Sequence, residues 1–392
     1  MREAVIVSTA RTPIAKAYRG AFNNLTGPSL AAHAMRAAVS RAGLEGGEIE
    51  DVTLGCALTQ GTTGVNVARH AAQATGLPDG VAGSTIDRQC ASGLSAISIA
   101  ANQVVNEGLS VALAGGLDSI SLVQNDKWNG YRYKDPAVPP TYYMSMLETA
   151  EIVAKRYDIS RDAQDEYALQ SQQRTAAAQQ AGRFDAEIEP VNAMQLVTDK
   201  TSGVTSEIAV TLNADQCNRP QTKLEGLQGL KPVLGEGTSI TAGNASQLSD
   251  GASACIIMER AEATRRGLTP LGTYRGMAVA GCAPDEMGIG PVFAIPRLLE
   301  RHGLSVDDIG IWEINEAFAS QLLYCRDRLG IPSEKLNVNG GAISIGHPYG
   351  MSGARMSGHV MIEGRRIGAK YAVVSMCIGG GQGAAALFEI EC

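Results

Sequence analysis

The sequence predicts an α/β fold built from two copies of one unit, with a segment of different character between them. At an offset of 260 residues, Arg41–Leu44 aligns with Arg301–Leu304, and Ser92-Gly93 aligns with Ser352-Gly353. In each copy, short and wholly apolar runs alternate with amphipathic stretches. This alternation is typical of parallel or mixed sheets covered by helices on both faces, so we expect two sheets related by pseudo-symmetry.

The first copy gives the order of elements. A helix is expected to end near Gly43, a strand follows over 51–56, and a second helix runs to Gly76. A third helix then carries an apolar stripe at helical spacing, formed by Leu94, Ile97, Ala101, Val104 and Val105. A strand over 110–114 closes the unit.

The second copy repeats this order. Its first helix ends near Gly303, a strand covers 309–314, and the next helix runs to Leu329. A strand over 371–376 closes it. We therefore divide the chain into a first half over 1–120, completed by about 244–270, and a second half over 271–392.

The repeat does not explain residues 121–243, which we interpret as an inserted loop domain. Helices are expected over 145–157 and between Ser160 and Gly182. The segment begins with a local concentration of aromatic residues, Trp128, Tyr131, Tyr133, Tyr142 and Tyr143. It is interpreted as a substrate-covering or oligomer-forming domain, and an ordinary surface excursion is the alternative.

Composition narrows the class of protein. The 33 Lys and Arg residues against 40 Asp and Glu give a net charge of −7 without a basic run, so no nucleic-acid partner is expected. No run of 18 apolar residues is present, and the N-terminus leads directly into Val5–Val7 rather than a signal peptide, so no membrane association is expected. Eight scattered cysteines without metal-ligand spacing indicate reduced thiols in the cytoplasm and no metal site.

The segment Asp87–Gly93 leads from an apolar run directly into the amphipathic helix, and it places Cys90 at the helix N-terminus. Backbone N–H groups and the helix dipole favour a thiolate there, so we expect the pKa of Cys90 to lie below its usual value of about 8.5. The position predicts a nucleophile; a small buried hydrophobic residue is the alternative.

Three further segments carry candidate chemistry. His347 follows a glycine-rich loop that pairs, within a few residues, with the Cys90 loop under the repeat, so it is a candidate base. Cys377 precedes the glycine-rich segment 379–383, whose N–H groups could stabilise an oxyanion. Asn315 and Glu316 stand between a strand and a helix, where the first could hold a water and the second could fix a base. All lie at strand ends or helix starts, where α/β sheets form their sites.

Together these four segments resemble the thiolase family in order and spacing along the whole chain. The matching motifs are Asp87–Gly93, Asn315–Ala319, Gly340–Arg355 and Cys377–Gly383. The resemblance implies a thiolase-like, duplicated, five-layered αβαβα fold with an inserted loop domain, and a homodimer or homotetramer. It implies a CoA-dependent acyltransferase without a bound cofactor, in which coenzyme A is a substrate.

The resemblance also implies residue roles. Cys90 is the acyl-accepting nucleophile, His347 activates it, and Cys377 is the acid and base at the α-carbon. A water on Asn315, with His347, forms one oxyanion hole, and the N–H groups of Cys90 and Gly379 form the other. Ser246 and, more weakly, Arg219 are assigned to coenzyme A, and Met146, Ala317 and Phe318 complete the implied substrate-binding residues.

Two positions depart from the family pattern. Asp87 stands where the family has Asn, and Leu147 stands where many members have Gly. The second change puts the shape of the acyl pocket in question. The aromatic stretch before it favours a degradative or broader-specificity enzyme.

We therefore expect a 3-ketoacyl-CoA thiolase of fatty acid β-oxidation that works by a ping-pong mechanism through a Cys thioester. An acetyl-CoA acetyltransferase specific for acetoacetyl-CoA is the alternative. A ketoacyl-synthase-type condensing enzyme is disfavoured by Cys377 and by the insertion. A non-catalytic acyl-CoA-binding protein is the remaining alternative.

Overall fold

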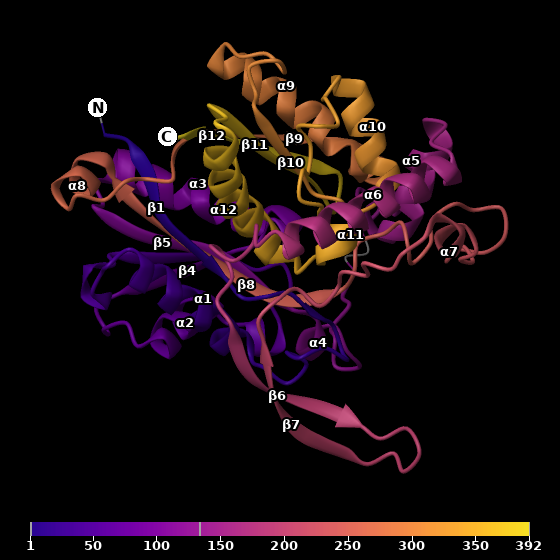
Figure 1. The fold of residues 1–392 in the computed structure, drawn as a ribbon, viewed down its shortest axis with the longest axis horizontal. Coiled ribbons are helices and arrows are strands. Elements are labelled where there is room, and N and C mark those ends of the chain that lie inside the picture. The colour runs from indigo at the N-terminus through magenta and orange to yellow at the C-terminus, as the bar shows by residue number, and fades with distance from the viewer. Residues whose placement is uncertain (1, 133–134, 392) are drawn as a thin grey trace.

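The computed structural model describes residues 2–132 and 135–391, and shows helices and strands in successive layers (Figure 1). Tyr133 of the aromatic stretch and Cys392, the last of the eight cysteines, lie outside the described residues. In the first half, the strand order is β4-β3-β5-β8-β1. These strands are β1 (Ala4–Arg11), β3 (Asp51–Gly55), β4 (Ala82–Ile86), β5 (Val111–Ser119) and β8 (Ser249–Glu259), and the short β2 (Ala15–Lys16) pairs with β8.

The second half repeats this pattern in the order β10-β11-β12-β9. In both halves two neighbouring strands are parallel, β3 with β5 and β10 with β11, and the strands that follow are antiparallel. The second-half strands are β9 (Gly272–Gly281), β10 (Ile311–Ile314), β11 (Tyr371–Ile378) and β12 (Gln382–Ile390). The duplication expected from the 260-residue repeat is therefore visible in the strand topology.

The two sheets are not separate, which corrects one expectation. β1 and β9 pair through Val5 with Thr273 and Ile6 with Gly272, so the strands form one continuous ten-stranded sheet. Periodicity within each copy cannot reveal this link, because only two residues of each strand take part in it.

Helices complete the five layers, and the predicted αβαβα arrangement is confirmed (Figure 1). One outer layer holds α1 (Gly27–Arg41) and α2 (Val67–Thr75), and the other holds α9 (Gly290–His302) and α10 (Ala319–Leu329). The central layer holds α3 (Ser92–Asn102), extended by a π-helical turn over Gln103–Glu107, and α12 (Tyr349–Ile367). Side chains of both central helices share one core with strands of both halves.

The central helices touch at their N-terminal turns because glycines face each other there. A Cβ on Gly93 would lie 2.4 Å from the carbonyl oxygen of Gly350, and one on Gly353 would lie 2.6 Å from the backbone nitrogen of Leu94. Both distances are too short for any side chain. This contact brings the loop before α3 beside the loop before α12.

The insertion contains the two expected helices. Ser145 and Glu148 form a capping box on α5 (Met146–Arg156), and Ser160 caps α6 (Arg161–Gln180). The remaining short helices of the described chain are α4 (Ile120–Val123), α7 (Leu224–Gln228), α8 (Arg260–Arg265) and α11 (Ala342–Ile345). Of the described helices, none combines the length and apolar character needed to span a bilayer.

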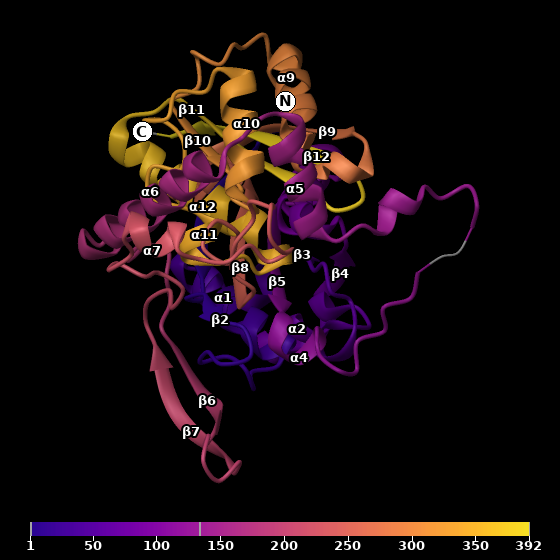
Figure 2. The same ribbon diagram turned by 90° about the vertical axis from the view of Figure 1, so that its right-hand side faces the viewer.

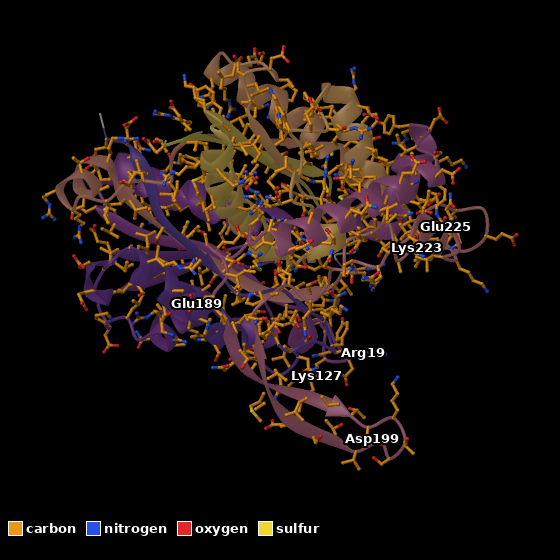
Figure 3. The ribbon with its side chains drawn as sticks, viewed as in Figure 1. Arg19, Lys127, Glu189, Asp199, Lys223 and Glu225 are labelled. Carbon is orange, nitrogen blue, oxygen red and sulfur yellow. The ribbon has the colours of Figure 1, made fainter. Side chains whose placement is uncertain are left out.

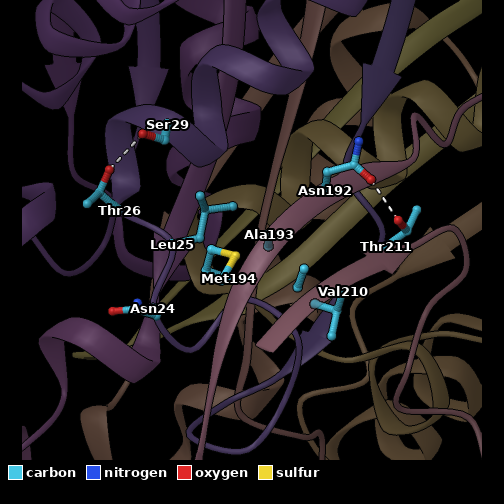
Figure 4. Close-up of a pocket in the computed structure, with 10 residues that line it drawn as sticks. Asn24, Leu25, Thr26, Ser29, Asn192, Ala193, Met194, Val210 and Thr211 are labelled. Carbon is cyan, nitrogen blue, oxygen red and sulfur yellow. Dashed lines mark hydrogen bonds between the residues drawn. The ribbon is translucent and has the colours of Figure 1, made fainter. Parts of the chain in front are cut away.

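The insertion also contains an antiparallel hairpin that the sequence analysis did not anticipate. Its strands, β6 (Val191–Thr198) and β7 (Thr205–Leu212), project from the layered body (Figure 2), and Asp199 lies near the tip (Figure 3). A groove of about 610 Å³ lies between this hairpin and the start of α1 (Figure 4).

Buried ion pairs join the insertion to the layered body. Arg11 of β1 contacts Glu187 at 2.7 Å and Asp215 at 2.7 Å, and these three side chains are almost fully buried. Glu187 also lies 2.9 Å from His359 of α12. The base of the insertion is therefore held against both halves.

Candidate active site

Cys90 lies in a tight turn between β4 and α3. Gln89, immediately before it, has a φ of +47°, and the carboxylate of Asp87 accepts the Gln89 N–H at 2.7 Å. The hydroxyl of Ser92 accepts the N–H of Arg88 at 2.8 Å and donates to the carbonyl of Gln89 at 2.6 Å. Side chains of the loop therefore hold the unfavourable left-handed residue before the thiol in place.

The expected low pKa of Cys90 is wrong for the enzyme without substrate. Burial, helped by the nearby carboxylate of Asp118, raises the pKa of the thiol to about 12. The N–H groups of Cys90 and Gly379 act in the opposite direction but do not prevail. A position at a helix N-terminus does not reveal desolvation, and the residues around Cys90 give no sign of a carboxylate 28 residues further along the chain. The resting thiol is protonated and needs a base.

His347 is a neutral imidazole because burial lowers its pKa to about 3. Its Nδ1 lies 2.6 Å from the Ser352 hydroxyl, which itself donates to the carbonyl of Pro348 at 3.0 Å. We therefore assign the proton to Nδ1. The lone pair is then on Nε2, which lies 3.2 Å from Nδ2 of Asn315.

Asn315 follows β10 and is buried. Its amide nitrogen faces His347, while its Oδ1 has no partner among the described residues. A buried acceptor without a donor is a site where a water or a substrate group completes the hydrogen bonding. The structure thus brings His347 and Asn315 together as the sequence analysis anticipated.

Cys377 and Gly379 lie at the end of β11. Cys377 is buried beside Met287, Ala317 and Phe318, and this burial raises the pKa of its thiol well above its usual value. Gly379 follows the strand, and its N–H points to the Cys90 sulfur closely enough to lower the pKa of that thiol. The two predicted thiols therefore lie at one site.

Glu316 does not contact His347. Its carboxylate accepts hydrogen bonds from Tyr167 at 2.7 Å, Ser171 at 2.7 Å and the N–H of Ile343 at 3.1 Å. Ile343 stands four residues before His347. Glu316 acts on the base only by anchoring the loop that leads to it.

The predicted coenzyme A residues form a neighbouring surface. The N–H of Ser246 donates to the carbonyl of Ala317 at 2.9 Å, and Ala245 forms a bridge with Phe318. Arg219 is exposed and reaches Gln247, next to Ser246, at 3.5 Å. These residues come together, while Leu147 packs against the apolar cluster around Cys377.

A cavity of about 550 Å³ opens at Cys90. Gly379 and Met146 line it, so two further predicted residues lie at the same cavity as Cys90. Trp128, Tyr142, Tyr143, Leu58 and Tyr349 also line it. The aromatic stretch was expected to cover the substrate or to contact another subunit, and three of its residues line this cavity.

Several residues near Cys90 were missed, among them Leu58, Tyr349 and Asp118. Leu58 and Tyr349 line the cavity, and Asp118 is buried beneath the nucleophile loop. Tyr349 could have been found, since it lies two residues after His347 in the predicted motif. Leu58 and Asp118 carry no local signal, because only the folded chain brings them to Cys90.

The geometry supports covalent acyl transfer. The described site combines a protonated thiol that lines a cavity, a second buried thiol and a neutral imidazole. Backbone N–H groups of Cys90 and Gly379 meet at the Cys90 sulfur. These groups can form a thioester, and they can stabilise the oxyanions that arise when the thioester forms and when it is consumed.

Comparisons with known proteins find matches along almost the whole chain. The family model "Thiolase, N-terminal domain" matches residues 4–261, and "Thiolase, C-terminal domain" matches residues 268–390. The 3-ketoacyl-CoA thiolase of Bacillus subtilis (strain 168) is 42% identical over 394 residues, which cover 100% of each chain. The human peroxisomal 3-ketoacyl-CoA thiolase is 41% identical, over 99% of this chain and 91% of that protein.

Solved structures are similar throughout. Human mitochondrial 3-ketoacyl-CoA thiolase has a TM-score of 0.88 at 38% identity, with 99% of each chain covered. Bacillus anthracis acetyl-CoA acetyltransferase has the same TM-score of 0.88 at 37% identity, over 100% of this chain and 99% of that chain. The human mitochondrial enzyme has also been solved in complex with CoA.

Proposed function

This chain belongs to the thiolase family and is a CoA-dependent acyltransferase, and we propose that Cys90 carries the acyl group in its thiolysis of 3-ketoacyl-CoA. The single observation that carries this proposal is the meeting of Cys90 and Gly379 at a cavity beside a second buried thiol, Cys377.

In the first half-reaction, His347 Nε2 takes the thiol proton and the Cys90 sulfur attacks the 3-keto carbon. The bond between C2 and C3 breaks, and its electron pair forms the enolate of acetyl-CoA. Cys377 protonates C2 of that enolate. The oxyanion of the enolate needs donors fixed in advance, and in this proposal a water on Asn315 and the protonated His347 supply them.

In the second half-reaction, the Cys377 thiolate takes the proton of the incoming CoA thiol. The CoA sulfur attacks the thioester carbonyl, and the oxyanion is stabilised by the N–H groups of Cys90 and Gly379. Collapse expels the Cys90 thiolate, which recovers its proton from His347. Acyl activation is conserved throughout, so no resident cofactor is required, and coenzyme A is a substrate.

For coenzyme A, we assign the surface formed by Ser246, Ala317 and Phe318, with Arg219 near its outer end and Met146 on the acyl side. The support is the pairing of the 241–246 loop with 317–318. A 3-ketoacyl-CoA thiolase is favoured over an acetoacetyl-CoA-specific acetyltransferase. The cavity of about 550 Å³ has the volume of sites that bind groups much larger than the acetyl group that such an acetyltransferase carries.

A homodimer or homotetramer is also proposed. In the described sheet, β4 pairs only with β3 on one side, and none of its five residues is buried. An edge strand of this kind is stabilised by pairing with its own copy around a two-fold axis. We assign the protein to the reducing cytoplasm, because the seven described cysteines are free thiols and the mechanism requires two of them.

The test is a thiolysis assay with free CoA and 3-ketoacyl-CoA substrates of increasing length. Cys90→Ala should lose at least about a thousandfold in kcat, while Cys255→Ala, at a buried cysteine of β8, should retain activity. Persistent turnover in Cys90→Ala would exclude the mechanism. Cleavage of acetoacetyl-CoA alone would establish the acetyltransferase, and binding without cleavage would establish an acyl-CoA-binding protein.

A further inference from the structure

The cavity at Cys90 has an aromatic wall. Four of its lining residues, Trp128, Tyr142, Tyr143 and Tyr349, carry aromatic rings, although aromatic residues make up only 5% of the chain. The first three come from one segment of the insertion, and the fourth comes from the start of α12. Rings from two distant parts of the sequence therefore converge on the nucleophile.

Backbone contacts fix the position of one ring. A Cβ on Gly380 would lie 3.1 Å from Cε2 of Tyr142, so this ring packs directly against the glycine loop. On the preceding residue, a Cβ of Gly379 would lie 3.9 Å from the sulfur of Met146. Tyr142 and Met146 thus flank the residue whose N–H faces Cys90.

The other rings are held by aromatic and cationic contacts. Tyr143 meets Tyr142 edge to face, with centroids 5.1 Å apart and an interplanar angle of 87°, and Arg132 lies over Tyr143 at 6.0 Å. Tyr349 meets His347 edge to face, with centroids 5.1 Å apart. These rings present faces and edges in several orientations around one space.

We propose that the acyl group transferred by this enzyme carries a planar ring, which binds between the aromatic side chains of the Cys90 cavity. This inference rests on the proposed function, since it concerns the acyl group bound to Cys90. A flat ring gains offset-stacked and edge-to-face contacts that a saturated linear chain cannot make. Leu58 and Met146 are the aliphatic residues with large side chains in the described lining, so a linear chain finds little matching surface.

The size of the cavity agrees with such a group. Its volume of about 550 Å³ lies within the range of roughly 300–1,000 Å³ typical of sites for drug-sized ligands. A second cavity of about 850 Å³ shares Trp128, Tyr143 and Met146 with it, so the space continues outward for ring substituents.

The test compares two substrates with the same number of acyl carbons, 3-oxo-5-phenylpentanoyl-CoA and 3-oxoundecanoyl-CoA. Each aromatic contact is expected to contribute about two- to twelvefold to kcat/KM. The wild-type enzyme should therefore cleave the phenyl substrate at least about tenfold more efficiently. Tyr143→Leu should lower kcat/KM for the phenyl substrate by about two- to twelvefold and leave the linear substrate within about twofold.

The matched control is Phe293→Leu, which removes an exposed ring from α9 and should change neither substrate. Equal or better cleavage of the linear substrate by the wild-type enzyme would overturn the inference while leaving the proposed function intact. Cleavage of acetoacetyl-CoA alone would also overturn it. Failure to cleave any 3-ketoacyl-CoA would remove the proposed function, and the inference with it.

Discussion

The backbone N–H of Gly350 donates to the carboxylate of Asp118 at 2.5 Å, which ties the first turn of α12 to the end of β5. The same carboxylate accepts the N–H groups of Ala57 and Leu58 at 3.1 and 3.0 Å. One buried acid therefore joins three segments around Cys90. It does so in spite of desolvation, which raises its pKa to about 6.

This raised pKa predicts a pH-dependent stability. The native state binds the Asp118 proton more tightly than the unfolded chain, so the contribution of Asp118 falls as pH rises from about 4 to about 6. Asp118→Asn removes this titration. We expect the variant's deficit in unfolding free energy to shrink by on the order of 2 kcal/mol across that window. Urea unfolding of both proteins at a series of pH values measures this difference in unfolding free energy. A difference that stays constant with pH would contradict the prediction.

The raised pKa of Cys90 predicts slow alkylation of the free enzyme. With a pKa of about 12, the thiolate fraction keeps rising between pH 7 and pH 10, so the rate of inactivation by iodoacetamide should rise without a plateau. Loss of thiolysis activity with time gives this rate. A plateau below pH 8 would instead reveal a thiolate paired with His347. Cys282→Ala is the control, and its rate of inactivation should match that of the wild-type enzyme if alkylation of the partly exposed Cys282 does not contribute.

The contact between Asn315 and His347 predicts that loss of the Asn315 amide lowers the rate of catalysis but hardly changes substrate binding. Asn315→Ala should lower kcat by about a hundred- to a thousandfold, as expected for one lost oxyanion-hole donor, with a small change in KM. Steady-state thiolysis measures both constants. The control Asn106→Ala removes an exposed amide on the π-helical turn and should have normal kinetics. A normal kcat in Asn315→Ala would remove this residue from the enolate site.

The close contact between α3 and α12 predicts that one added methyl group between these helices lowers both stability and activity. In Gly353→Ala the new Cβ would lie 2.6 Å from the nitrogen of Leu94, which should cost about 1–3 kcal/mol of stability and move the loop that carries His347. Thermal unfolding and kcat should therefore decline together. Gly80→Ala is the matched control, because a Cβ there has open space and no positive φ. An unchanged kcat in Gly353→Ala would show that the helices can separate without moving the base.

Much of the layered body could be predicted because its signals are local. Apolar runs predicted the starts of β3, β5, β10 and β11 to within a few residues. Capping residues such as Ser160 predicted the long helix of the insertion. The hairpin β6–β7 was missed, because its alternation is imperfect and its residues are mostly exposed. The pairing of β1 with β9 was missed because it depends on the packing of the two halves.

The candidate site divides in the same way. Cys90, His347 and Asn315 stand in recognisable segments, and the fold brings their loops together. The predicted protonation state of Cys90 was wrong, because the pKa of this thiol depends on burial and on Asp118. Neither can be recognised from the sequence near residue 90. Sequence patterns located the reactive groups, but the surrounding packing decides their charge.

Among the described residues, the duplicated topology carries the candidate site once. The 260-residue offset pairs Cys90 with Gly350 and Asn315 with Gly55, so the symmetry-related positions carry no side chain. A Cβ on Gly350 would lie 2.4 Å from the carbonyl oxygen of Leu117 and 2.7 Å from that of Gly55, so backbone occupies the space of a second site. The proposed nucleophile, Cys90, therefore belongs to the first half, while the proposed base, His347, and the second thiol, Cys377, belong to the second, so the proposed reaction needs both halves.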